Sequence, residues 1–423
     1  MFPYEIWNKT FTKKSLKEIF ESKVKKSNTI GTDMVSTTKF SENLDDNIEI
    51  ILRKVNNEKY HFTRYNKLLF SKGEGKPPRV IYLPTVRDKI TLCAINDILI
   101  YIYNNACKTQ LPQIVIKELI EEIPHYDSFI KLDVKTFYRS INHKLLLKKL
   151  NQKIKKKQLL SLIEKSINNG VSDGRGIPEG LTISNSLANI FMMSIDFKYQ
   201  QMTNLKYVRY VDDILILCNS KDKSSINEEI KKDLQDMDLE LNEKVDDGLI
   251  SKGFTYLGYK MNNKLITVRQ SSVLTLERRL EYIIKHSNKD NCKISEWKLN
   301  LRIAGFINND RKYGWIFYYS QLNDLKLLFH LDDLVQKLLK RYGVENYIHP
   351  KRYVRTYFEI TKALSTTNYI YNFDTYSIER KRQILKELNF DVDNQSADAI
   401  EYLFNRLIGK LIKNIEHDIQ HLS

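Results

Sequence analysis

The sequence has few cysteines and no long apolar run, and each absence excludes a class of protein. Its four cysteines, Cys93, Cys107, Cys218 and Cys292, include no CxxC or Cys/His pair, so neither a zinc site nor a disulfide framework is predicted. No window of about 18 uninterrupted apolar residues occurs, and the first residues lack the basic and apolar regions of a secretion signal. We therefore expect a cytoplasmic protein that does not enter a membrane.

The charge of the chain is strongly unbalanced. Its 68 Lys and Arg exceed its 52 Asp and Glu, giving a net charge of +16 and an isoelectric point near 9.3. Such a surplus suits a polyanionic partner, and nucleic acid is the first candidate, although a Lys-rich and Asn-rich composition can also reflect the base composition of a gene. The 423 residues, 42% of them hydrophobic, predict two or three packed units without internal repeats.

The pattern along the chain predicts an α+β core followed by helices. An apolar helix is expected from Asp88 to Asn105, after charged amphipathic helices and a Gly-Pro segment. The runs SFIKLDV and YVRYVDDILILC predict buried strands, and GLISKGFTYLGYKMNNKLITV predicts two more with an Asn-Asn turn. A helix is expected from Ser225 to Leu239. From Val273 onward the chain reads as almost entirely helical and closes with a helix from Ala397 to Ile415.

Three aspartates follow or separate these predicted strands. Asp133 ends one, and Asp212 and Asp213 lie between two others, so neighbouring strands could bring all three to one sheet edge. Nucleotidyl transfer needs two divalent ions about 3.5 to 4 Å apart, and carboxylates are ligands that Mg²⁺ prefers. Turn chemistry and helix capping are the structural alternatives. Adjacent acids beside buried strands repel each other unless cations compensate them, which favours a metal site.

The run YVDD with apolar flanks resembles the signature of reverse transcriptases. FIKLDVKTFYRSINH, GIPEGLTISNSLANIF, LELNEKVDDG and FTYLGYKM resemble further motifs of that family in the same order. Upstream, IGTDMVSTTKF and PPRVIYLPTVRDKI are similar to N-terminal motifs of group II intron and other bacterial reverse transcriptases. The resemblance implies a right-hand polymerase with fingers, a palm with an antiparallel sheet, and a thumb. It implies fingers and palm at 1–265, a helical thumb at 266–345 and a helical C-terminal region at 346–423.

The same resemblance implies a catalytic centre. Asp133, Asp212 and Asp213 would be metal ligands, Asp212 the stronger of its pair, and the carbonyl of Val134 would complete one coordination sphere. The cofactor would be Mg²⁺, with Mn²⁺ as a substitute. Lys244 lies where the family has a lysine proposed to protonate the leaving pyrophosphate.

Nucleotide and template contacts are implied as well. Tyr138 falls where the family places an aromatic ring that collides with a ribose 2′-hydroxyl, while its neighbour Phe137 is expected in the core. The implied fingers contain three basic residues whose charges suit binding to oxygens of the triphosphate or the template: Lys76, Arg79 and Arg87.

The second motif and the thumb supply further implied contacts. Pro178 and Gly180 belong to a loop whose glycines would let backbone approach the nucleotide, although Glu179 stands where relatives often carry Gln and Arg139 where they are often acidic or Pro. Gly258, Arg278 and Arg279 would contact template and primer, the alternative for the two arginines being a solvated helix face. The aromatic-rich segment 302–339 is expected to be core.

The function implied is RNA-directed DNA polymerisation from dNTPs to a cDNA product. The helical C-terminal third resembles defence-associated reverse transcriptases, which implies an RNA template encoded nearby as a noncoding RNA and a role in phage defence. Two alternatives stay open: a retron or group II intron-type enzyme without a defence role, and a catalytically idle RNA-binding scaffold. The sequence contains no His/Cys-rich endonuclease module, which argues against a role in intron mobility.

Overall fold

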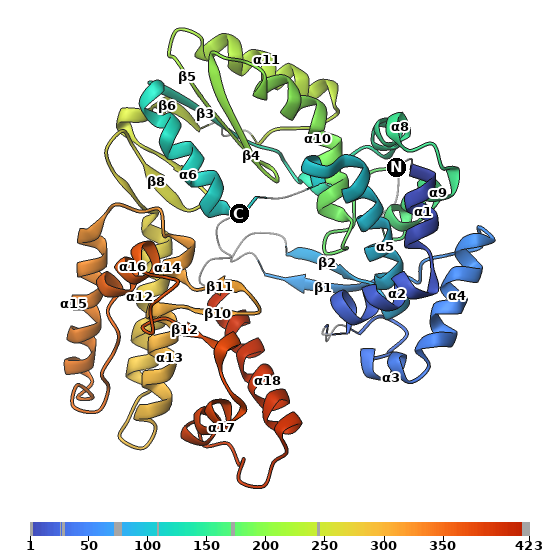
Figure 1. Ribbon diagram of the computed structural model, residues 1–423. Helices are drawn as coiled ribbons and strands as arrows, with labels where there is room; N and C mark the ends of the chain where they lie inside the picture. Colours follow the sequence, from blue (N-terminus) through green and yellow to red (C-terminus); the bar gives the residue numbers. More distant parts are fainter. Residues whose placement is uncertain are drawn as a thin grey trace. The chain divides into compact units, whose positions relative to one another are not determined.

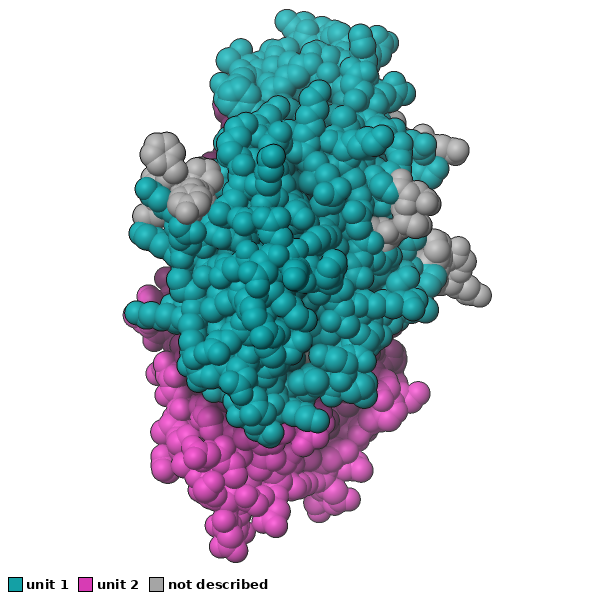
Figure 2. Space-filling model, turned by 90° about the vertical axis from the view of Figure 1, so that its right-hand side faces the viewer, with its two compact units in different colours: residues 1–110, 126–248 teal, residues 111–125, 249–423 magenta. Residues whose placement is uncertain are grey.

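The computed structural model describes residues 3–25, 27, 30–71, 78–107, 110–170, 174–242 and 246–416. The chain divides into two compact units, coloured separately in Figure 2. The first comprises residues 1–110 and 126–248, and the second comprises 111–125 and 249–423. Among the described residues, no helix is long and apolar enough to cross a membrane. The finer division into palm and thumb at residue 265 stays a prediction.

A four-stranded sheet forms the centre of the first unit. Its strand order is β4 (Leu205–Tyr210), β5 (Asp213–Cys218), β3 (Ser128–Asp133) and β6 (Asp246–Leu249), and β5 runs antiparallel to both neighbours. All side chains of β5 after Asp213 are buried, as expected for a strand that is apolar on both faces. Helix α10 (Ser184–Gln200) packs against β4, and α11 (Lys223–Asp236) packs against β3 (Figure 1).

Helix α5 (Val86–Tyr103) organises the N-terminal part of this unit. Its apolar side chains are almost all buried, and the Thr85 hydroxyl accepts a hydrogen bond from the Asp88 amide at 3.2 Å. This N-cap starts the helix two residues before the predicted Asp88. Helices α1 (Pro3–Thr10), α2 (Lys13–Ile19) and α4 (Leu44–Asn56) and a π-helical turn (Phe20–Val24) contact α5. The further elements of the first unit are α3 (Thr37–Glu42), the hairpin β1 (Asn66–Phe70) and β2 (Arg79–Leu83), α7 (Phe137–Ser140), α8 (His143–Lys153) and α9 (Lys157–Asn168).

The second unit contains a three-stranded antiparallel sheet where two strands were predicted. Its strands are β7 (Phe254–Tyr256), β8 (Tyr259–Met261) and β9 (Ile266–Val268). Leu257 and Gly258 both have left-handed backbone, which closes a two-residue β7–β8 turn. The expected Asn turn lies between β8 and β9, where the Asn262 side chain accepts hydrogen bonds from the Lys264 and Leu265 amides.

The rest of the second unit is predominantly helical, as predicted. Phe306, Trp315 and Tyr319 are fully buried, which confirms that the aromatic-rich segment is largely core. The α+β class with a helical C-terminal region is confirmed. The helices are α6 (Pro112–Glu122), α12 (Gln270–Lys285), α13 (Cys292–Ala304), α14 (Trp315–Tyr318), α15 (Leu325–Arg341), α16 (Tyr353–Lys362), α17 (Ile378–Glu387) and α18 (Ala397–Glu416).

One part of the C-terminal prediction is wrong, because a small sheet interrupts the helices. It contains β10 (Phe306–Asn308), β11 (Arg311–Tyr313) and β12 (Tyr371–Asn372). Asn309 and Asp310 both have positive φ and form the two-residue turn of the β10–β11 hairpin. The Asp374 carboxylate accepts hydrogen bonds from their two amides, at 2.6 and 2.9 Å, and this contact from a distant segment fixes the turn.

Candidate active site

The three predicted aspartates lie at one end of the β3–β5 pair. Asp133 is directly opposite Asp213 in the antiparallel register, and opposed residues of such a pair project from the same face of a sheet. The Val134 amide lies 3.5 Å from the Asp212 carbonyl oxygen, so the turn that carries Asp212 adjoins the end of β3. Most side chains of both strands are apolar and buried up to this point, and their burial fixes the register.

The turn that carries Asp212 has an uncommon backbone and is held by Arg209. Val211 has a φ of +60°, a left-handed conformation that costs a β-branched residue on the order of 1–3 kcal/mol. Arg209 Nη1 donates to the Val211 carbonyl oxygen at 2.8 Å, and the same guanidinium binds both carboxylate oxygens of Asp196 on α10 at 2.7 and 2.6 Å. Sequence reasoning did not single out Arg209; the signal that could have found it is an arginine between apolar and aromatic residues just before the aspartate pair.

Asn242 holds Asp133 in place through two hydrogen bonds. Its side-chain Nδ2 donates to Asp133 Oδ2 at 2.7 Å, and its backbone amide donates to the Asp133 carbonyl oxygen at 2.9 Å. Val134 forms an isolated bridge with Leu241, which brings the segment after α11 alongside the end of β3. Asn242 therefore orients the Asp133 carboxylate. It belongs to the segment LELNEKVDDG, in which only Lys244 was predicted to act, and Lys244 lies outside the described residues, as does Lys76.

The carboxylate oxygens at this edge of the sheet are of the kind that binds a hard divalent cation. Across the part of the chain that the structure describes, no three His, Cys, Asp or Glu side chains gather as a ready metal site. Asp133 and Asp213 nevertheless face each other across a strand pair, with Asp212 next in the chain, and carboxylate oxygens suit Mg²⁺. The residues therefore fit such an ion in the chemistry of their donor atoms and in their shared place at the end of the strand pair.

Tyr138 lies beside the aspartates on the short helix α7. Its ring packs against Phe137, and its hydroxyl donates to Asn185 Oδ1 on α10 at 2.6 Å. Burial, followed by the charges of Asp212 and Glu179, raises the pKa of Tyr138 to about 12, so its hydroxyl is neutral near pH 7. Phe137 is 2% exposed, which confirms its predicted place in the core.

Arg79 reaches the same site, whereas Arg87 does not. Arg79 begins β2, and its Nε lies 2.6 Å from Glu179 Oε2; the charges of both residues act on the Tyr138 hydroxyl. Arg87 lies in the first turn of α5, where its Nη2 donates to Asn47 Oδ1 of α4 at 3.0 Å. The structure therefore brings Arg79, Glu179, Tyr138 and the aspartates together, and it directs Arg87 toward the N-terminal helices.

The loop of Pro178 and Gly180 is built against β2. The buried Pro178 carbonyl oxygen accepts a hydrogen bond from Ser184 Oγ at 2.6 Å, and the Tyr82 amide donates to the Glu179 carbonyl oxygen at 2.7 Å. Gly180 has a φ of +96°, and a Cβ there would lie 2.6 Å from Ile81 Cγ2 and 3.1 Å from the Tyr82 carbonyl oxygen. The close approach of strand β2 therefore requires a residue without a Cβ at this position, and the predicted nucleotide contact of Gly180 stays a prediction.

Gly180→Ala is accordingly expected to destabilise the protein by about 1–3 kcal/mol, because it combines a positive φ with a clash against β2. Chemical denaturation measures the loss. Gly174→Ala is the matched control, since Gly174 also has a positive φ but nothing lies within 4 Å of its Cβ position. Equal losses in the two variants would mean that backbone conformation, rather than the approach of β2, requires the glycine at residue 180.

A family model decides what this arrangement of motifs represents. The model described as reverse transcriptase (RNA-dependent DNA polymerase) matches residues 71–261. This part of the chain is a reverse transcriptase domain. The resemblance drawn from the sequence motifs is thereby confirmed. The domain includes Asp133, Asp212, Asp213, Tyr138 and Arg79, and with its antiparallel sheet and flanking helices it bears out the predicted fold class.

Other proteins are similar to part of this chain. A protein of Schizosaccharomyces pombe, "Uncharacterized 91 kDa protein in cob intron", is 29% identical over 167 residues, which are 36% of this chain and 20% of that protein. "Group II intron-encoded protein LtrA" of Lactococcus lactis subsp. cremoris is 25% identical over 185 residues, 39% of this chain and 30% of LtrA. This chain thus matches less than a third of each of these relatives.

Solved telomerase structures are similar at a lower level. Apo telomerase from Candida tropicalis, truncated from its C-terminal domain, is 15% identical, with 57% of this chain and 63% of that chain covered and a TM-score of 0.40. Telomerase from Candida albicans with a TWJ fragment of telomeric RNA is 12% identical, with 92% and 69% covered and a TM-score of 0.43.

The three residues predicted to contact template and primer lie in the second unit. Gly258, near the end of the reverse transcriptase domain, has a φ of +79° in the β7–β8 turn, and its carbonyl oxygen accepts a hydrogen bond from the Arg269 amide at 2.9 Å. Arg278 and Arg279 follow the domain as exposed residues of α12. Their exposure suits phosphate contacts and a solvated helix face equally.

Proposed function

We propose that this chain is an RNA-directed DNA polymerase that makes cDNA from dNTPs. The observation that carries the proposal is the placement of Asp133 opposite Asp213, beside Asp212, within a reverse transcriptase domain. These carboxylates, with the Val134 carbonyl, would hold Mg²⁺ or Mn²⁺. The ions would supply charge stabilisation and an activated 3′-hydroxyl. Extension of a labelled primer on an RNA template tests the proposal, and a purified protein that binds the primed template but never extends it would contradict it.

The other residues of the site would position the incoming nucleotide. Tyr138 presents a ring that would exclude a ribose 2′-hydroxyl, and Asn185 holds that ring through the tyrosine hydroxyl. Arg79 would bind triphosphate oxygens, because a guanidinium forms charge-assisted hydrogen bonds with phosphate. Asn242 would keep one Asp133 oxygen engaged, so that the carboxylate stays oriented. Lys244 would protonate the leaving pyrophosphate.

Glu179 is expected to compete with the nucleotide for Arg79. Because Arg79 is paired with Glu179 at 2.6 Å, a triphosphate must displace a carboxylate before it gains the guanidinium. In the variant Glu179→Gln, the KM for dNTPs should fall by about two- to fivefold with kcat nearly unchanged, since the pair is partly exposed and exposed pairs contribute about 1 kcal/mol or less. Steady-state primer extension measures both constants.

A matched control removes a similar charge elsewhere. Glu49→Gln breaks the ion pair of Glu49 with Lys13 among the N-terminal helices, and it should leave the KM unchanged. A raised KM in Glu179→Gln would show that the Glu179 carboxylate itself binds the nucleotide.

The cellular role that we propose is phage defence in a bacterial cytoplasm, with a noncoding RNA encoded nearby as template. The support is the resemblance of the helical region beyond the reverse transcriptase domain to defence-associated enzymes. The partial similarity to LtrA supports a second candidate, a retron or group II intron-type enzyme without a defence role.

Sequencing the RNA and DNA recovered with the protein from its native host separates the two candidate roles. A single enriched noncoding RNA with complementary DNA, together with phage sensitivity of a strain carrying the Asp212→Ala, Asp213→Ala variant, fits defence. Intron RNA in its place fits the alternative.

A further inference from the structure

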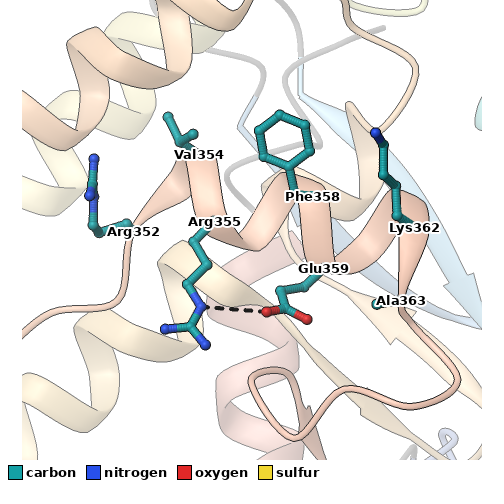
Figure 3. A pocket seen from close by; sticks show the side chains of 7 residues that line it. All are labelled: Arg352, Val354, Arg355, Phe358, Glu359, Lys362 and Ala363. Atoms are coloured by element: carbon teal, nitrogen blue, oxygen red, sulfur yellow. Dashed lines mark hydrogen bonds and ion pairs between the residues drawn. The ribbon is translucent and has the colours of Figure 1, made fainter.

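Helix α16 presents one open face on the second unit. Tyr353 and Thr356 are fully buried and anchor the helix, whereas the opposite side carries large exposed side chains. This exposed side lines a groove of about 460 Å³. Figure 3 shows Phe358 and Lys362 along one stripe of the helix and Arg355 and Glu359 along the next. The exposed residues of the groove are Arg352, Arg355, Phe358 and Lys362.

The cations of this groove are only partly neutralised. Arg355 Nε lies 3.4 Å from Glu359 Oε1, yet 63% of the Arg355 side chain is exposed. Arg352 pairs with Asp332 at 3.5 Å and is 61% exposed. Lys362 Nζ lies 5.5 Å from the centroid of the Phe358 ring. Three solvent-accessible cations thus share the groove with one lining carboxylate, and this excess suits an anionic ligand.

A layer of aromatic rings and a further cation lies next to the groove. Arg355 Cζ is 4.3 Å from the Tyr369 ring centroid, and Lys351 Nζ is 4.4 Å from Tyr369 and 4.2 Å from Tyr371. Burial and then the charge of Arg355 lower the pKa of Lys351 to about 8. Cations are therefore crowded here without an equal number of carboxylates, and a bound polyanion would relieve their repulsion.

We propose that the α16 groove binds single-stranded RNA. Arg352, Arg355 and Lys362 would contact successive phosphates, and a base would stack on the exposed ring of Phe358. Single strands are favoured over duplexes because their base faces are free to stack. Glu359 would favour RNA over DNA, since its carboxylate can accept a hydrogen bond from a 2′-hydroxyl, which DNA lacks.

This RNA site lies outside the reverse transcriptase domain and does not depend on polymerisation. All of its residues follow residue 261, where the family match ends. RNA held here would be kept on the protein while another part of the strand is copied. Binding is therefore measured without dNTPs, so that a protein inactive in primer extension still gives a result.

Photocrosslinking of the full-length protein locates the bound strand. A 4-thiouridine RNA of about 15 nucleotides, long enough for a single-strand site, is crosslinked and the protein is digested with trypsin. The expected crosslinked peptide is Thr356–Lys362, which contains Phe358. A matching 4-thiothymidine DNA should label it at least about tenfold less. Crosslinks elsewhere but not in this peptide, equal labelling by DNA, or displacement of the RNA by polyglutamate would each overturn the proposal.

Binding affinity supplies the second measurement. The double variant Arg355→Gln, Lys362→Gln should reduce the slope of log K against log salt by about 1.4, because each single-strand phosphate contributes about 0.7. Phe358→Ala should raise the Kd about tenfold through lost stacking. The controls are Lys410→Gln with Lys413→Gln, two exposed cations of α18, and Phe329→Ala, a 54% exposed ring of α15. Unchanged slopes and Kd values in the groove variants, or equal changes in the controls, would refute the site.

Discussion

Replacement of Asp212 and Asp213 by alanine is expected to lower dNTP incorporation on a primed RNA template by about 10³-fold or more. The two carboxylates sit beside Asp133 at the end of β3 and β5, and their removal would leave one of the three acidic ligands for the divalent ions. Metal ions contribute several kcal/mol of charge stabilisation in the transition state, and each 1.36 kcal/mol corresponds to about tenfold in rate. Single-turnover primer extension with saturating dNTP measures the loss.

Two controls separate lost chemistry from lost structure. Asp212→Asn with Asp213→Asn keeps the size of both side chains and should be almost as inactive, because an amide is a much weaker ligand for Mg²⁺ than a carboxylate. Asp236→Asn removes an exposed carboxylate at the end of α11 and should leave the rate unchanged. If the double alanine variant folds with a normal melting temperature and still incorporates dNTPs, the catalytic assignment is wrong.

The fold class and the position of the aspartates could be predicted because both depend on local pattern. After Asp213, β5 is a continuous apolar run, and β3 is apolar except for Ser128 and Lys131; such runs are typical of buried strands. Asp133 and Asp213 end those runs, so the pairing of the two strands brings them together automatically. Helix α5 was predicted to within two residues at each end for the same reason, because almost all of its apolar side chains face the core.

The contacts that hold the site could not be predicted, because they join segments far apart in the chain. Asn242 reaches Asp133 across 109 residues, and Arg79 reaches Glu179 across 100. The same limit explains the missed strands β10 to β12, since β10 pairs in parallel with Tyr371–Asn372 and the β10–β11 turn depends on Asp374. The sequence motifs indicated which residues belong to the site; they carried no information on which partner each residue binds.

Tyr138→Ala is expected to reduce the preference for dNTPs over ribonucleotides by about 10- to 100-fold. Removal of the ring would make room for a 2′-hydroxyl, and a single steric feature of a pocket typically contributes about 1–3 kcal/mol of discrimination. The ratio of kcat/KM for a dNTP to kcat/KM for the matching ribonucleotide measures the effect. Tyr138 is 8% exposed and packs against Phe137, so the melting temperature of the variant must be measured alongside.

Tyr138→Phe distinguishes the ring from its hydroxyl. Because the pKa of Tyr138 is about 12, its hydroxyl is neutral and adds no charge that could repel a ribonucleotide. Phenylalanine keeps the ring and loses only the hydrogen bond to Asn185, so it should retain most of the discrimination. Asn185→Ala removes the same hydrogen bond from the other partner and should resemble Tyr138→Phe. If Tyr138→Phe instead discriminated as poorly as Tyr138→Ala, the hydroxyl and its partner Asn185 would set the sugar preference, and the ring would serve chiefly as core packing.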